Sequence, residues 1–271
     1  MMALITCNFF SDVLNLSTTM TVILPEETSN QIGQKNRRMD GKLPVLYLLH
    51  GFSDDHTIWS RRTSIERYAA SYGIAVIMPQ VDHSFYLDMS YGKKYWTFIA
   101  EELPQKARSF FPLSDKREDN FVAGLSMGGY GAWLWALRHP DRFAAAASLS
   151  GVMDIATHYR QVKGESNPVA NALYHIFAGE DLTDTDVDLF YLLQMLKEDK
   201  QRIPKLFQAC GTEDFLWDSN KRMYQFAMEL DVPITESFSA GEHEWGYWDT
   251  VIQEVLEWLP IQNNPASRKK H

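Results

Sequence analysis

The 271-residue chain has little cysteine, and this scarcity excludes several kinds of stabilisation. Its two cysteines, Cys7 and Cys210, provide neither a disulfide framework nor the paired spacing of a zinc site. Cys210 lies in an apolar stretch, where a cysteine is typically a small buried hydrophobic side chain and not a nucleophile. The cysteine content therefore favours a reducing compartment.

Long hydrophobic runs and an early positive charge are also missing. No stretch approaches the roughly 18 consecutive apolar residues that cross a bilayer. The first basic residue is Lys35, and polar residues interrupt the apolar ones before it. The amino-terminal segment thus has neither the charged region nor the apolar core of a signal peptide. We expect a soluble, cytoplasmic protein that does not associate with membranes.

Basic residues are outnumbered, with 26 lysines and arginines against 35 aspartates and glutamates and a formal net charge of −9. This balance argues against nucleic-acid partners and anionic membrane surfaces. A basic cluster, Arg268-Lys269-Lys270, lies near the carboxyl terminus. Residues 263–271 are predicted to form a polar, disordered tail.

Metal-binding patterns are incomplete. The segment that begins at His243 starts like an H-E-x-x-H zinc helix, but Tyr247 stands where the second histidine is required. Aspartates alternate between residues 184 and 188 like the first ligands of a calcium loop, but Leu189 replaces the required glycine. We interpret these aspartates as negative charge at the start of a helix. The sequence predicts no metal site.

The composition, 45% hydrophobic and 13% aromatic, is sufficient for one large core. The length fits a single α/β domain over residues 1–262. Strand and helix signals alternate, which predicts a mostly parallel central sheet with helices on both faces. Edge strands are expected at 6–10 and 19–24, and core strands at 44–49, 74–78, 120–125, 145–149, 205–210 and 234–238.

Helix starts and one insertion can also be predicted. Residues 63–66, Thr-Ser-Ile-Glu, have capping-box spacing, and Asp218 or Ser219 is expected to cap a later helix. Residues 152–201 exceed a normal crossover and predict a small cap or crossover insertion near a site. The apolar run 189–193 could line a pocket, but it favours the buried face of a crossover helix.

The strongest positive signal is the run Val-Ala-Gly-Leu-Ser-Met-Gly-Gly-Tyr-Gly at residues 122–131. It contains a G-x-S-x-G pattern centred on Ser126. Such a pattern turns sharply from a strand into a helix, and its glycines relieve the crowding at the strained turn. An apolar strand precedes the pattern, and a helical segment follows it until about residue 138. We predict that Ser126 is a nucleophile, although a serine at this position could merely cap the helix.

A serine hydroxyl is a weak nucleophile near neutral pH, so it needs a base and a carboxylate that orients the base. His243 follows the last expected strand, and Asp214 follows the strand before it. Both residues therefore lie at carboxyl ends of strands, where open α/β sheets place their chemistry. The order serine, acid, histidine is that of α/β-hydrolases. Glu213 or Asp218 could replace Asp214, and His243 could instead be a structural loop histidine.

An acyl-transfer site also needs backbone N–H groups that stabilise the oxyanion. Met127 follows the candidate nucleophile and is expected to donate one of them. The strand at 44–49 ends in His50-Gly51, which places the N–H of Phe52 as the second donor. Gly51 would let the backbone approach the substrate, and His50 is expected to hold this loop by hydrogen bonds.

These motifs resemble the esterase D group of α/β-hydrolases, and within it the short bacterial tributyrin esterases. The resemblance implies a serine hydrolase of short-chain acyl esters, with Ser126, Asp214 and His243 as the triad. It also implies Phe52 and Met127 as the oxyanion donors. Acyl transfer to water through an acyl-enzyme requires no cofactor. The matching segments are 48–52, 88–92, 101–104, 124–132, 210–215 and 241–248.

The substrate is less constrained than the reaction. We expect acetyl to butyryl esters, with Gly51, Tyr91, Trp96 and Trp245 around the pocket, although aromatic residues near a site are often only packing. The wider group includes S-formylglutathione hydrolases, feruloyl esterases and mycolyltransferases, so a thioesterase or a feruloyl or acetyl-sugar esterase is an alternative. A non-catalytic binding module is a further alternative from a different class. The sequence leaves self-association open.

Overall fold

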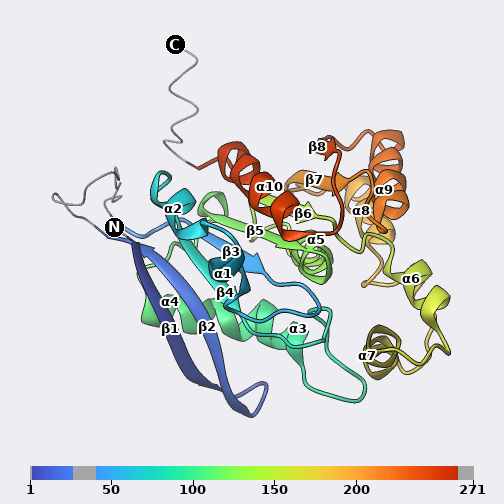
Figure 1. Ribbon diagram of the computed structural model, residues 1–271, viewed down its shortest axis with the longest axis horizontal. Helices are drawn as coiled ribbons and strands as arrows, with labels where there is room; N and C mark the ends of the chain where they lie inside the picture. Colours follow the sequence, from blue (N-terminus) through green and yellow to red (C-terminus); the bar gives the residue numbers. More distant parts are fainter. Residues whose placement is uncertain (1, 27–40, 262–271) are drawn as a thin grey trace.

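A computed structural model describes residues 2–26 and 41–261, which form an eight-stranded sheet in the order β1-β2-β4-β3-β5-β6-β7-β8 (Figure 1). The six strands from β4 to β8 in this order are parallel, whereas β1 and β2 form an antiparallel hairpin at one edge. The predicted mostly parallel sheet is therefore present. The strands are β1 (Met2–Ser11), β2 (Leu16–Pro25), β3 (Val45–Leu49), β4 (Ala75–Pro79), β5 (Asn120–Leu125), β6 (Ala145–Leu149), β7 (Lys205–Gly211) and β8 (Ile234–Ser239).

Helices cover both faces of the sheet and enclose two hydrophobic cores. Alternate side chains of β3 enter opposite cores, with Tyr47 on one side and Leu46 on the other. This double burial explains why the core strands are continuous apolar runs in the sequence. The helices are α1 (Ile58–Arg62), α2 (Ile65–Ala70), α3 (Tyr95–Thr97), a π-helical turn (Phe98–Glu102), α4 (Leu103–Phe110), a 3-10 turn (Arg117–Asp119), α5 (Met127–Arg138), α6 (Ile155–Val162), α7 (Pro168–Phe177), α8 (Leu189–Glu198), α9 (Trp217–Glu229) and α10 (Trp245–Trp258).

The predicted core strands agree with the observed ones to within one residue at each end. The amino-terminal hairpin is longer than predicted, because its backbone pairing runs from Met2 opposite Pro25 to Ser11 opposite Leu16. The apolar pattern that predicted the shorter strands covers only part of this ladder. Main-chain pairing thus continues where the side-chain signal stops.

One of the two predicted helix starts is wrong. The segment 63–66 does start α2 at Ile65, and Thr63 Oγ1 accepts a hydrogen bond from the N–H of Ile65 at 3.1 Å, whereas Ser64 makes no side-chain cap. Helix α9 begins at Trp217, before Asp218, because the carboxylate of Asp214 accepts the N–H of Leu216 at 2.8 Å. In both places a side chain from the preceding turn satisfies the free backbone donor.

Residues 152–201 contain three helices with two different roles. Helices α6 and α7 project beside the carboxyl edge of the sheet (Figure 1), whereas α8 packs between α5 and α9. Leu189 and Leu193 are buried, and the ring of Phe190 lies 5.1 Å from that of Phe226. The apolar run at 189–193 is therefore the buried face of a crossover helix, and α6 and α7 form a cap.

Further expectations concern metals, membranes and the tail. Within residues 2–26 and 41–261, no group of three His, Cys, Asp or Glu side chains could hold a metal ion. No helix in the same described ranges has the length and apolarity to cross a bilayer.

Asp188, one of the alternating aspartates, caps α8 by accepting the N–H of Phe190 at 2.9 Å. The predicted polar tail at 263–271 lies outside the described residues.

Candidate active site

Ser126 lies at the sharp turn between β5 and α5, with φ 53° and ψ −117°. A positive φ is uncommon for a residue other than glycine, so the surrounding structure must hold this turn. The N–H of Ser126 donates to the carbonyl of Leu149 on the neighbouring strand at 2.9 Å. A Cβ at Gly128 would lie only 2.5 Å from the carbonyl oxygen of Leu49. The turn therefore requires glycine at this position for close packing, as the motif predicted.

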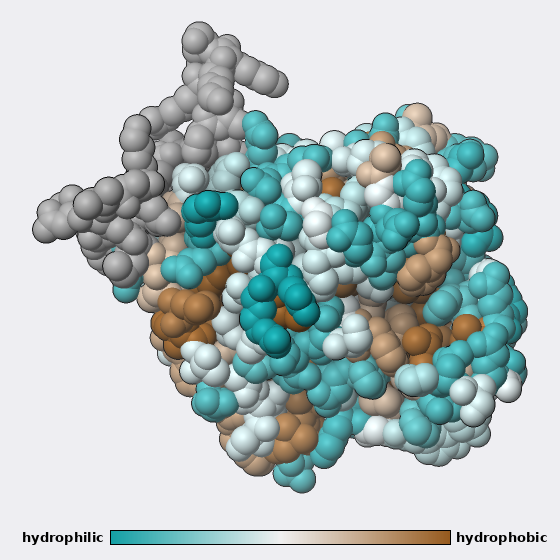
Figure 2. Space-filling view, in the orientation of Figure 1, coloured by the Kyte–Doolittle hydropathy of each residue, from teal (hydrophilic) through white to brown (hydrophobic). Residues whose placement is uncertain are grey.

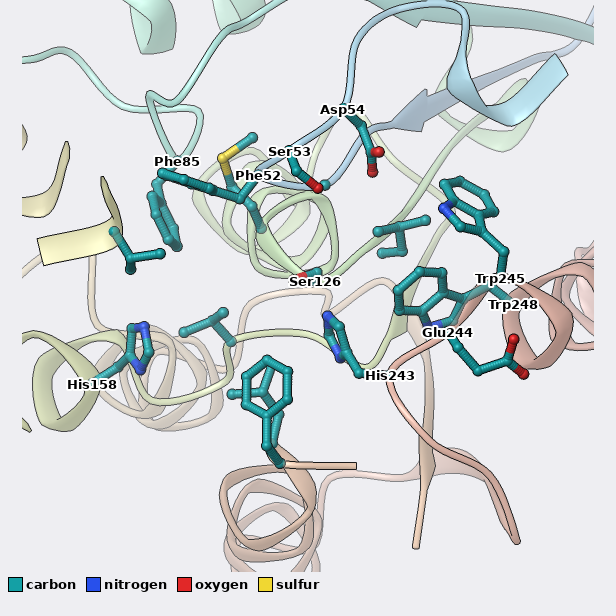
Figure 3. Close-up of a pocket in the computed structure, with 17 residues that line it drawn as sticks. Phe52, Ser53, Asp54, Phe85, Ser126, His158, His243, Glu244, Trp245 and Trp248 are labelled. Atoms are coloured by element: carbon teal, nitrogen blue, oxygen red, sulfur yellow. The ribbon is translucent and has the colours of Figure 1, made fainter. Parts of the chain in front are cut away.

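Asp214 and His243 meet at the carboxyl ends of β7 and β8. His243 Nδ1 lies 2.8 Å from Asp214 Oδ2, and Figure 3 shows the imidazole beside Ser126. Burial acts to raise the pKa of Asp214, but the hydrogen bond and charge interaction with His243 outweigh it and lower the pKa. An ionised Asp214 holds the proton of His243 on Nδ1, which leaves Nε2 available for Ser126.

The two alternative acids lie elsewhere. Glu213 is exposed, and its carboxylate accepts the N–H of Gly241 at 2.6 Å. Asp218 is an exposed residue in the first turn of α9. The fold thus brings Asp214, and neither of these two carboxylates, to the imidazole of His243.

Two residues that support Asp214 were missed by the sequence analysis. Ser150 follows β6, is fully buried at φ 48°, and forms a side-chain hydrogen bond with Asp214. Trp248 donates its indole N–H to Ser150 Oγ at 3.1 Å and packs edge-on against His243, with ring centroids 4.8 Å apart. The signal available in the sequence was a serine directly after a buried strand, at the same edge of the sheet as the other site residues.

The candidate oxyanion donors, Phe52 and Met127, both line the same cavity as Ser126. Among the described residues, neither backbone N–H has a hydrogen-bond acceptor. Both groups are thus available to an oxygen atom of a ligand. The N–H of Met127 is also the first of helix α5, where the helix dipole favours negative charge.

His50 holds the loop that contains Phe52, as expected from the sequence. Its Nδ1–H donates to the carbonyl of Gly51 at 2.7 Å, and its Nε2 accepts the N–H of Val81 at 3.2 Å. Tyr86 donates its hydroxyl to the His50 carbonyl at 2.8 Å. Burial lowers the pKa of His50 to about 4, so the ring is neutral near pH 7. Its role in this geometry is to fix the loop.

A cavity of about 460 Å³ lies between the sheet edge and the cap, and Figure 2 shows this face hollowed with apolar residues inside. Its walls are mainly apolar. Its polar groups include Asp54 and His158, which lies on α6. Burial raises the pKa of Asp54. Figure 3 shows the lining residues, which are Gly51, Phe52, Ser53, Asp54, Phe85, Leu125, Ser126, Met127, Val152, His158, Val169, Phe215, Leu216, His243, Glu244, Trp245 and Trp248.

Of the expected substrate-binding residues, Gly51 and Trp245 line the cavity, but Tyr91 and Trp96 do not. Tyr91 is 61% exposed and stacks on Tyr174 of the cap, with ring centroids 6.1 Å apart. The ring of Trp96 lies 4.2 Å beneath the guanidinium of Arg138. Both aromatic residues therefore pack against other surfaces, a role that the sequence analysis also considered.

Phe85, Phe215, His158 and Val169 line the cavity without having been predicted. Phe215 is 73% exposed, and its ring centroid lies 4.5 Å from that of His243. His158 and Val169 enter from α6 and α7. No sequence pattern reveals which side of a cap helix faces a site, so these residues required the structure.

Comparison with known proteins identifies the family of this chain. A family model described as putative esterase matches residues 11–259. An acetyl esterase of Caldicellulosiruptor saccharolyticus is 33% identical over 262 residues, which are 95% of this chain and 98% of the relative. Substrate-bound FphF, a fluorophosphonate-binding serine hydrolase of Staphylococcus aureus, is 38% identical with a TM-score of 0.85, covering 96% of this chain and 98% of FphF.

A second solved structure is the S-formylglutathione hydrolase FrmB of Staphylococcus aureus, without ligand. It is 37% identical with a TM-score of 0.82, covering 96% of this chain and 99% of FrmB. These neighbours support an α/β-hydrolase fold for this chain. The chain belongs to the putative-esterase family of α/β-hydrolases and is a carboxylic ester hydrolase.

Proposed function

We propose that this protein is a serine carboxylesterase that hydrolyses short-chain acyl esters, acetyl to butyryl, through Ser126, His243 and Asp214. The observation that carries the proposal is the 2.8 Å contact between Asp214 and His243 beside Ser126 in a largely apolar cavity. The similarity to an acetyl esterase supports a small acyl group. No cofactor takes part in the proposed mechanism.

The proposed mechanism begins when His243 Nε2 accepts the proton of Ser126 Oγ as this oxygen attacks the carbonyl carbon of the ester. The N–H groups of Phe52 and Met127 stabilise the negative charge that develops on the carbonyl oxygen. His243 then gives its proton to the departing alcohol, and an acyl-enzyme remains. Water attacks this intermediate by the same steps, which releases the acid and restores the Ser126 hydroxyl.

The arrangement of the cavity suggests where the two parts of the ester lie. The alcohol must leave next to His243, whose surroundings are Trp245 and Trp248 (Figure 3). Phe85 and His158 lie on the other side of Ser126, and we assign that side to the acyl group. Val169 lines the cavity from α7, and we assign to it the limit on the length of an acyl chain.

A second candidate function is hydrolysis of a small thioester. The observation that favours it is the 37% identity to the S-formylglutathione hydrolase FrmB over almost the whole chain. A ferulic acid esterase is also similar, at 25% identity and a TM-score of 0.75, which keeps an aromatic acyl group as a third candidate. All three candidates would use the same triad, so substrate preference distinguishes them.

The experiment is a comparison of kcat/KM on acetyl, butyryl, octanoyl and feruloyl esters and S-formylglutathione, with the Ser126→Ala variant in parallel. The proposal predicts the highest value for the acetyl or butyryl ester and loss of that activity in Ser126→Ala. A far higher value for S-formylglutathione would replace it with the thioesterase. Equal weak rates for both proteins would refute the assignment of Ser126.

Several finer expectations stay predictions. They are the particular likeness to tributyrin esterases, a cytoplasmic location, a single domain over residues 1–262, and the absence of nucleic-acid and membrane partners. Self-association also stays open. The proposed catalytic residues lie on one chain and need no second copy.

A further inference from the structure

A second cavity, of about 350 Å³, lies at the opposite end of the sheet from Ser126. Asn120, which begins β5, lines it, whereas Ser126 follows the carboxyl end of the same strand. Trp135 also lines it and lies eight residues along α5 from Met127, about 12 Å at 1.5 Å per residue. The two cavities share no lining residue among those described.

Three buried hydrogen-bonding atoms in the wall of this cavity have no partner among the described residues. They are the hydroxyl of Tyr47, the Nε of Arg108 and the indole nitrogen of Trp135. Tyr47 and Trp135 are each only 1% exposed. Folded proteins pair nearly all such groups with protein atoms, ordered water or a ligand, so three unpartnered groups beside one cavity favour an acceptor there.

The guanidinium of Arg108 also has almost no partner for its positive charge. Its one recorded side-chain contact is from Nη2 to Asn120 Oδ1 at 3.5 Å, at the limit of a hydrogen bond. In the described part of the chain, no carboxylate lies within ion-pair distance of this guanidinium. The residues of the inner wall therefore carry one positive charge and three unpaired, buried donors.

The other charged residues that line the cavity lie towards its rim. Glu101, Asp115 and Asp141 are exposed. Arg142 donates to the carbonyl of Ala100 at 2.6 Å and lies 3.5 Å from Glu101, so it is already engaged. A rim with three carboxylates disfavours a ligand of high negative charge.

We propose that this cavity binds a small carboxylate, whose oxygens accept hydrogen bonds from Arg108, Tyr47 and Trp135. Arginine recognises carboxylates through paired, charge-assisted hydrogen bonds. A cation is disfavoured by Arg108, and a phosphate dianion carries more charge and more acceptor oxygens than this wall can match. The rings of Tyr47, Trp135 and Phe143 pack 4.9 to 6.2 Å apart and hold the two ring donors in place.

The test is NMR of the full chain with 15N-labelled tryptophan. The indole signal of Trp135 is assigned by its loss in Trp135→Phe, and the signals of Trp245 and Trp248 report separately on the catalytic cavity. Acetate, butyrate and phosphate are titrated at constant ionic strength against sodium chloride. The proposal predicts a saturable shift of the Trp135 signal with acetate or butyrate, at a midpoint different from any shift of the other two signals.

Substitutions distinguish a site from a general salt effect. Arg108→Gln is expected to weaken acetate binding about tenfold or more, because a charge-assisted hydrogen bond is lost. Tyr47→Phe keeps the ring and should weaken binding by a smaller factor, which also provides a second test if Arg108→Gln fails to fold. Lys106→Gln removes a positive charge outside the cavity lining and should leave binding unchanged.

Three results would overturn the proposal. They are a Trp135 signal that does not move with carboxylates, an equal response in Arg108→Gln and wild type, and stronger binding of phosphate than of acetate. The first result would mean that only water fills the cavity. None of these results depends on whether Ser126 is catalytic.

Discussion

At the scale of single residues, three side chains that lie far apart in the sequence meet at one edge of the sheet. Ser126 follows β5, Asp214 follows β7 and His243 follows β8. Each was predictable, because a functional residue at the carboxyl end of a parallel strand is placed by the strand itself. Tyr91 and Trp96 were not predictable, because aromatic character does not show which way a loop side chain points.

The acid is the triad member most open to test. Asp214→Asn should lower kcat for a short acyl ester by about 10⁴-fold, because the amide cannot hold His243 in the required tautomer. Asp218→Asn is the matched control, since Asp218 is exposed in the first turn of α9 and should keep near-normal activity. Kinetics of both variants check this prediction, and a larger loss in Asp218→Asn would contradict it.

At the scale of elements, the core strands were predictable to within one residue because each is buried on both faces and bounded by polar segments. Helix starts were less predictable. The cap expected at Asp218 or Ser219 failed because Asp214, in the preceding turn, bonds the free backbone donor instead. Such local competition depends on loop geometry, which sequence spacing does not specify.

The cap helices should control the length of the acyl chain. Val169→Phe fills part of the cavity beside the assigned acyl side and should lower kcat/KM for a butyryl ester about tenfold more than for an acetyl ester. Trp96→Phe, outside the cavity lining, should leave this ratio unchanged. Measured kcat/KM values for the butyryl and acetyl esters check this prediction. An unchanged butyryl-to-acetyl ratio in Val169→Phe would place the acyl group elsewhere.

At the scale of the whole molecule, alternating strand and helix signals in the sequence predicted the mostly parallel sheet. No sequence signal predicted the positions of the two cavities. The second cavity arises where β3, β5, α4 and α5 converge, and its residues Tyr47, Arg108 and Trp135 show no common sequence pattern. Cavities depend on how helices pack over a sheet. They are therefore visible only in three dimensions.

Stability should fall in mild acid, in part because of His50. Its pKa is about 4 in the folded state and about 6.5 in an unfolded chain, so the unfolded state binds an extra proton between these values. Stability is thus fully present above pH 6.5 and decreases as the pH falls, by about 2 kcal/mol between pH 7 and pH 5 from this group alone.

Urea unfolding at pH 7 and pH 5 checks this prediction against the His50→Gln variant. The variant should be less stable at pH 7, because it loses hydrogen bonds that hold the Phe52 loop, but its stability should depend less on pH. The same pH dependence in both proteins would show that His50 is not the group responsible.

The central claim, that Ser126 is the nucleophile of an esterase, is tested most directly by fluorophosphonate labelling followed by peptide mass mapping. We expect one label per chain, located on Ser126, with loss of butyryl ester hydrolysis in proportion to labelling. Ser126→Ala should take no label and show no activity above background. A label on another residue, or full ester hydrolysis by Ser126→Ala, would contradict the account.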